Sequence, residues 1–197
     1  MDDTAAKPNP ASVLAGDDTF TCNDKDAFCV SEFWQWAFSD LQSNALRGIL
    51  AEYIVAQALG IEPAGRASWD DYDLEMADGT TIEVKSTAYL QTWAQTKPSV
   101  LQFGGLRGRT WSPEDGYSKE QAYRADVYVF CVQTARTEPE YDPLDLTRWE
   151  FGVLPRDVLA TRGTKSMRWS VVERLADRVV TYRELEEEVA AVTLADE

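Results

Sequence analysis

Hydrophobic and polar positions change their spacing several times along the chain, and these changes predict an α/β fold. A helical repeat covers 41–59 and ends at Gly60, a residue typical of helix C-termini. Alternating residues at 81–88 predict a half-buried strand, and the apolar run at 125–132 predicts a strand buried on both faces. The other expected elements are strands at 72–76, 149–154 and 167–172 (the last at a sheet edge), a short helix after Pro155, and a helix opened by the capping box Thr181–Glu184 and ending near Val192.

This order of elements predicts one α/β domain over 19–197, with a central mixed β-sheet flanked by helices. Residues 1–18 are rich in Asp, Ala, Pro and Ser, which is typical of a disordered acidic tail. The aromatic stretch 26–40 predicts a short helix that packs on the core, and the segment 91–120 shows no clear pattern. The aromatic residues of this helix are Phe33, Trp34, Trp36 and Phe38.

Composition changes which chemistry is available. The chain has no histidine, which excludes Ser-His-Asp triads, histidine zinc sites and nucleases with a histidine base. Hydrolytic chemistry would therefore use carboxylates, lysine and a metal ion. The net charge of −15, from 34 acids and 19 bases, disfavours binding of nucleic acid unless the bases cluster locally. No apolar run reaches the roughly 20 residues of a membrane span, and no signal peptide precedes the domain, so a cytoplasmic protein is expected.

One acid interrupts the apolar face of the long helix. At 100° per residue, Glu52 falls inside the apolar stripe. A carboxylate on a buried face is costly unless it is paired or bound to a cation. A salt bridge to a buried Arg or Lys would explain it without any function. The apolar stripe consists of Leu41, Ala45, Ile49, Ala56 and Leu59.

The hairpin at 72–88 carries the other candidate residues. Glu83 and Lys85 alternate with apolar neighbours and so share one face of their strand. A two-residue turn would place Asp73 on the opposite face. A three-residue loop, 77–79 with Gly79 left-handed, instead pairs Asp73 with Glu83. Glycine in the third position favours this second register, and we adopt it.

In that register two carboxylates lie on neighbouring strands with a lysine one repeat further along. Asp73 and Glu83 could hold one divalent ion, and hard oxygen ligands favour Mg²⁺ or Mn²⁺ over zinc. Such an ion polarises a phosphodiester and activates water, while Lys85 can orient that water or stabilise developing charge. The alternative interpretation is that the charged face of the strand is simply solvated.

The pattern YDL-x8-EVK, preceded by a helix with RG-x3-E, resembles the PD-(D/E)XK nuclease superfamily. The resemblance implies a restriction-endonuclease-like core with its motifs in 44–133. It also implies that Asp73, Glu83 and the main-chain carbonyl of Val84 bind metal, that Lys85 is catalytic and that Glu52 is the helical acid. Supporting roles beside the triplet, as contacts to DNA, would go to Ser86, Gln91 and Gln95.

A metal-dependent deoxyribonuclease, in a bacterial restriction or phage-defence system, is the function that this resemblance favours. Its best candidate phosphate contacts are Lys97, Arg107 and Arg109, although the motif alone favours isolated surface bases at these positions. A double-strand cut requires two sites, so a homodimer is also expected. The competing hypothesis is a non-catalytic acidic module that docks a protein partner through its aromatic residues.

Overall fold

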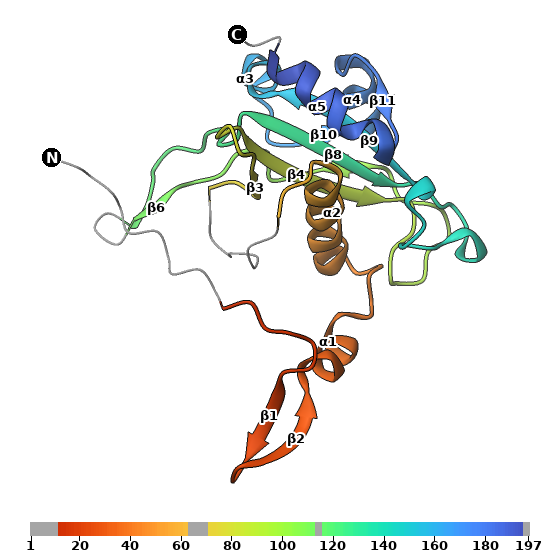
Figure 1. The fold of residues 1–197 in the computed structure, drawn as a ribbon. Helices are drawn as coiled ribbons and strands as arrows, with labels where there is room; N and C mark the ends of the chain where they lie inside the picture. The colour runs from red at the N-terminus through yellow and green to blue at the C-terminus, as the bar shows by residue number, and fades with distance from the viewer. Residues whose placement is uncertain (1–11, 63–70, 113–115, 195–197) are drawn as a thin grey trace, which may run out of the picture.

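A five-stranded mixed sheet organises the body of the protein in this computed structural model, which describes residues 12–62, 71–112 and 116–194 (Figure 1). The strand order is β11-β9-β8-β4-β3, in which β4 and β8 run parallel and the other neighbours run antiparallel. The sheet thus has the mixed α/β form that the sequence predicts. Its strands are β3 (Leu74–Glu75), β4 (Thr81–Ala88), β8 (Val127–Gln133), β9 (Trp149–Pro155) and β11 (Val179–Val180).

Helices cover both faces of this sheet, and each face has its own apolar core. On one face α2 (Asn44–Ala58) and α5 (Leu185–Leu194) pack over the sheet and contact each other. On the other face lie α3 (Arg156–Arg162) and α4 (Trp169–Leu175), together with the loop that precedes β8. All seven residues of β8 are buried, as its continuous apolar run predicts.

The β3–β4 hairpin has the predicted register. Leu74 pairs with Ile82, which continues to a pairing of Asp73 with Glu83. The amide of Met76 donates to the carbonyl of Thr80 at 2.9 Å, so the loop contains three residues. Gly79, the last of them, has φ of +91°, a conformation that glycine adopts without steric cost. The strand before the loop is shorter than predicted, because only two of its residues form the ladder.

The buried face of α2 differs from the predicted stripe. Ala45 and Ile49, two members of that stripe, are exposed. The helix instead turns Ala51, Ile54 and Val55 toward the sheet, because this face contacts β4. Glu52 follows the buried Ala51 and is half-buried at the border of that face. The helix also begins three residues later than expected, where the Ser43 side chain accepts a hydrogen bond from the amide of Leu46.

The predicted edge strand 167–172 is wrong. Only Met167–Arg168 forms a strand, and Trp169 begins α4. Trp169 and Val172, three residues apart on that helix, pack directly against Gly152 of β9. A Cβ at this glycine would lie 2.6 Å from Cγ1 of Val172, so the helix can approach the strand only because a side chain is missing there. The predicted strand at 149–154, the helix after Pro155 and the capping box before α5 are confirmed.

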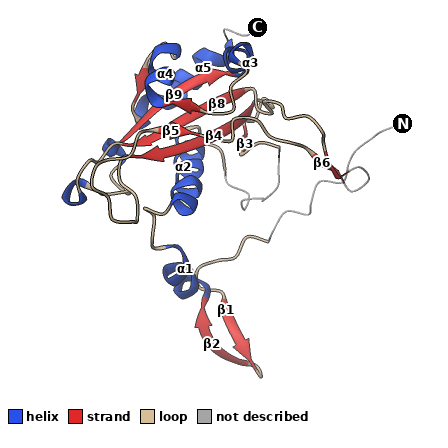
Figure 2. Cartoon of the chain, turned by 180° about the vertical axis from the view of Figure 1, so that it is seen from behind, coloured by secondary structure: helices blue, strands red, loops and turns tan. Residues whose placement is uncertain are grey.

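The N-terminal segment forms an arm that extends away from the sheet (Figures 1 and 2). We call 19–38 the aromatic arm; it consists of β1 (Thr19–Cys22), β2 (Lys25–Cys29) and α1 (Val30–Phe38). The predicted packing of its aromatic helix on the core is wrong. The rings pack on each other instead: Phe33 lies 6.0 Å from Phe38 and 6.5 Å from Trp36, and Trp36 is 85% exposed.

Several short elements complete the chain. Residues 1–11 of the predicted tail lie outside the described residues. Further along the same segment, the main-chain carbonyls of Gly16 and Asp18 accept hydrogen bonds from the first residues of α1. No described helix has both the length and the apolar character needed to cross a membrane. The remaining strands are β5 (Gln102–Phe103), β6 (Trp111–Ser112), β7 (Gly116–Tyr117) and β10 (Met167–Arg168), and 3-10 turns occupy Glu138–Glu140, Leu146–Arg148 and Tyr182–Glu184.

Candidate metal centre

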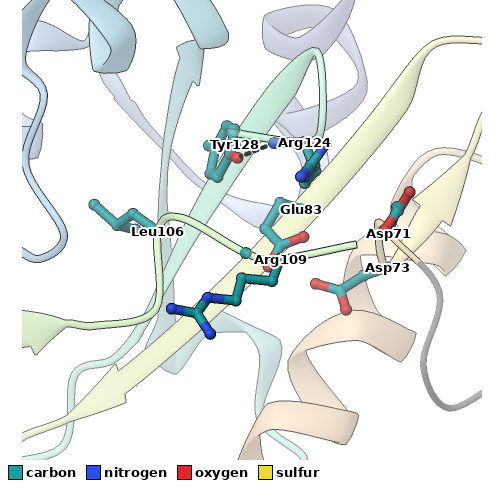
Figure 3. A pocket seen from close by; sticks show the side chains of 8 residues that line it. Asp71, Asp73, Glu83, Leu106, Arg109, Arg124 and Tyr128 are labelled. Atoms are coloured by element: carbon teal, nitrogen blue, oxygen red, sulfur yellow. Dashed lines mark hydrogen bonds between the residues drawn. The ribbon is translucent and has the colours of Figure 1, made fainter. Parts of the chain in front are cut away.

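A small cavity lies where the β3–β4 hairpin meets the loop before β8. Its volume is about 130 Å³, and we call it the acid cavity. Figure 3 shows the carboxylates of Asp73 and Glu83 facing this space, with the guanidinium of Arg109 directed away from Asp73. The lining residues are Asp71, Asp73, Glu83, Leu106, Gly108, Arg109, Arg124 and Tyr128.

Asp73 is the most perturbed acid of the cavity. One carboxylate oxygen, Oδ2, accepts a hydrogen bond of 2.8 Å from the main-chain amide of Val84. Burial, followed by the nearby charges of Glu83 and Glu52, raises the pKa of Asp73 from 3.8 to about 7. The Val84 hydrogen bond and Lys85 lower it only in part. Negative charge is therefore crowded around Asp73, which is the condition that a bound cation relieves.

Glu83 and Lys85 project from β4 on the same face and form an ion pair. Both side chains are largely shielded, with exposed fractions of 17% and 22%. Their face is the one that carries Tyr128, because the parallel register places Glu83 beside Tyr128 of β8. The strand alternation thus brings an acid and a base to one polar site, while Ile82 and Val84 fill the opposite core.

Val84 contributes main-chain groups at the same sheet edge. Its amide points toward β3, as the bond to Asp73 shows. In a β-strand the carbonyl of a residue points to the same side as its amide. The carbonyl of Val84 therefore lies on the side of Asp73, where β3 is too short to continue the ladder.

Glu52 approaches from the helix layer. It lies on α2, which packs on the opposite face of the sheet from Glu83. Its charge nevertheless raises the pKa of Asp73, which places Glu52 within electrostatic reach of the cavity at the sheet edge. The buried Arg47 of the same helix donates to the carbonyl of Gln42 at 3.1 Å and to the side chain of Asn44.

Two carboxylates, of Asp73 and Glu83, and the carbonyl of Val84 are oxygen donors of the kind that bind a hard divalent cation. Among the described residues, no three His, Cys, Asp or Glu side chains converge on one point at metal-ligand spacing. Asp73 and Glu83 do line the same cavity, and the desolvated Asp73 is flanked by acids. Ions such as Mg²⁺ are held by one or two carboxylates and keep several waters, so this smaller set is sufficient.

The predicted nucleic-acid contacts are divided by the structure into two groups. Gln91 and Gln95 close the turn after β4: the amide of Gln91 donates to Oε1 of Gln95 at 2.7 Å, and Gln91 is buried. Ser86 is half-buried on β4, and Lys97 is exposed beyond that turn. None of these four residues lines the acid cavity, whereas Arg109 does.

Arg124 and Tyr128 belong to the cavity but were not among the predicted site residues. The hydroxyl of Tyr128 accepts a hydrogen bond of 3.0 Å from the main-chain amide of Arg124. Burial raises the pKa of Tyr128 to about 12, so the phenol is neutral at physiological pH. In the sequence Tyr128 belongs to an apolar run, and only the parallel pairing of β4 with β8 reveals that it lies beside Glu83.

Comparison with known proteins finds no family model that matches the chain and no curated protein with a similar sequence.

Proposed function

We propose that the chain is a metal-dependent nuclease that hydrolyses phosphodiester bonds of DNA, built on a restriction-endonuclease-like core. The observation that carries the proposal is the hairpin register, which directs Asp73 and Glu83 into one cavity with Lys85 paired to Glu83. Simple solvation of a charged strand does not require an acid as buried as Asp73, whose pKa is raised to about 7.

The proposed metal ligands are the carboxylates of Asp73 and Glu83 and the carbonyl of Val84, with Glu52 as a flanking acid. A bound Mg²⁺ or Mn²⁺ would polarise the phosphate and lower the pKa of an attacking water. The protein's own contribution is to place these acids side by side in a shielded site, where a divalent cation offsets the repulsion that raises the pKa of Asp73.

Lys85 supplies positive charge beside these acids. Its ion pair with Glu83 fixes the ammonium on the face of the sheet that lines the cavity. From there the ammonium can orient a water or stabilise the charge that develops on the phosphate oxygens. The neutral hydroxyl of Tyr128 is a further donor facing the same space.

The test is cleavage of plasmid and of single-stranded DNA with Mg²⁺, Mn²⁺ or EDTA. We expect cleavage that needs the metal and that falls by at least about 100-fold in Lys85→Ala and in Glu83→Gln. Asp78→Asn is the matched control, because Asp78 lies in the same hairpin but is exposed and outside the cavity. Metal-independent cleavage, or full activity in Lys85→Ala, would refute the proposal.

A second candidate function is favoured by the aromatic arm. Six of its large apolar side chains are exposed, which is unusual for a segment without a partner. A protein-binding module would use this surface and have no need of Lys85. This alternative would be favoured if the wild type cleaves no DNA and Trp36→Ala no longer forms a complex with a co-purifying protein. Lys85→Ala should then form that complex as the wild type does. The six residues are Phe20, Phe28, Phe33, Trp34, Trp36 and Phe38.

A further inference from the structure

A second cavity lies beside the acid cavity and has the opposite charge. Its volume is about 340 Å³, and we call it the basic cavity. Arg109 lines both cavities, so the two spaces are neighbours on the same loop. Its lining residues are Arg107, Arg109, Lys119, Glu120, Gln121 and Lys165.

Hydrogen bonds tie together the three segments that form the basic cavity. Gly108 and Ala122 exchange main-chain hydrogen bonds of 2.9 and 3.0 Å, which hold the segment of Arg109 beside the segment that carries Lys119. The carbonyl of Lys165 accepts a hydrogen bond from the amide of Leu106 at 3.3 Å. The bases thus come from positions far apart in the sequence and are brought together by the fold.

Arg107 is the most firmly held of these bases. Its Nε donates to the carbonyl of Gln121 at 3.1 Å, and its Nη2 donates to the same oxygen. Its guanidinium also lies 5.7 Å from the centre of the Tyr123 ring. Tyr123 is fixed in turn, because its hydroxyl donates to the carbonyl of Thr164 at 2.6 Å.

The concentration of positive charge stands out in a chain of net charge −15. In the described part of the chain, ion pairs hold Lys85, Arg148, Arg156 and Arg178, but none holds any of the four bases of the basic cavity. One acid, Glu120, accompanies these four bases in the lining. Holding four like charges together without an acidic partner among the described residues opposes folding, and an anionic ligand would offset that repulsion.

We propose that the basic cavity is a phosphate-binding subsite that holds a backbone phosphate of the nucleic-acid substrate beside the acid cavity. This assignment rests on the proposed function for the identity of the substrate. Arg109 lines both sites, and the ammonium groups of the exposed Lys119 and Lys165 contact the phosphate as point charges. The subsite meets the condition that an acidic protein must gather its bases locally to bind a polyanion.

The test measures binding in EDTA, where cleavage does not interfere. Fluorescein-labelled single-stranded and duplex oligonucleotides are titrated with the wild type and with Lys119→Ala/Lys165→Ala, by fluorescence anisotropy at several salt concentrations. We expect the double variant to bind about tenfold more weakly and to lose about 2 from the slope of log affinity against log salt. Both lysines are exposed, so the fold should tolerate the change. Arg183→Ala, an exposed base on the C-terminal side, is the control and should bind as the wild type does.

The outcomes separate the subsite from the nuclease. Metal-dependent cleavage with unchanged oligonucleotide binding in the double variant would overturn the subsite and leave the nuclease intact. Weaker binding in the double variant, from a wild type that cleaves nothing, would support the subsite and refute the nuclease. Inorganic phosphate is the third probe: if the substitutions weaken only its binding, the assignment to a nucleic-acid backbone is overturned.

Discussion

Asp73→Asn should stabilise the metal-free protein while it abolishes activity. The substitution removes a charge that burial, Glu83 and Glu52 all disfavour. It keeps an oxygen that can accept the hydrogen bond from the amide of Val84. Asparagine therefore has almost the same shape and main-chain contact as the acid, and the difference in stability reports the charge alone.

The magnitude follows from the pKa of Asp73. A rise from 3.8 to about 7, at about 1.4 kcal/mol per pH unit, sets a ceiling of about 4 kcal/mol on the penalty for the ionised form. The folded state binds the proton more tightly than the unfolded state does. Stability of the wild type should therefore fall as pH rises from about 4 to about 7 and stay level above that range.

Urea denaturation in EDTA measures this effect. The gain in free energy of unfolding of Asp73→Asn over the wild type should widen by about 2 kcal/mol between about pH 5.5 and about pH 8. Asp78→Asn is the control, because hydrogen bonds from Thr80 lower the pKa of Asp78 and the sign of its effect is opposite. A gain that is absent, or that does not depend on pH, would refute the crowding of negative charge at Asp73.

Substitutions at Gly79 and Gly152, with Gly104 as a control, test the fold that positions the site. Gly79→Ala should lower the free energy of unfolding in urea by about 1 kcal/mol, because φ of Gly79 is +91° and no neighbouring atom lies within 4 Å to add a clash. Gly104→Ala is the control: Gly104 has open space and no positive φ, so the loss should be less than about 0.5 kcal/mol. Equal effects of the two would contradict the assigned loop. Gly152→Ala should cost about 1–3 kcal/mol because the new Cβ meets Val172, and adding Val172→Ala should recover part of that loss; a double variant no more stable than Gly152→Ala would count against this contact.

Local patterns in the sequence predicted the elements whose burial or turn geometry depends on neighbouring residues alone. The apolar run of β8 predicted a strand buried on both faces. Glycine in the third loop position predicted the register that pairs Asp73 with Glu83. Both inferences required only neighbouring residues, since periodicity and turn geometry are local properties.

The features that the sequence did not predict depend on contacts between distant segments. The helix at Trp169 replaces an expected strand because Gly152, seventeen positions earlier, leaves room for it. Tyr128 becomes a site residue only through the parallel pairing of β8 with β4. The aromatic arm shows the converse case, in which residues typical of a core are exposed because the arm extends away from the sheet (Figure 1). Its hairpin was also missed, although Asn23 and Asp24 have positive φ and occupy its two-residue turn.

Binding of Mn²⁺, followed by electron paramagnetic resonance at moderate salt, tests most directly whether Asp73 and Glu83 together form a metal centre. We predict one Mn²⁺ site per chain in the wild type, lost in both Asp73→Asn and Glu83→Gln and kept in Asp78→Asn. A wild type that binds no Mn²⁺, or single variants that bind it as tightly as the wild type does, would contradict the account.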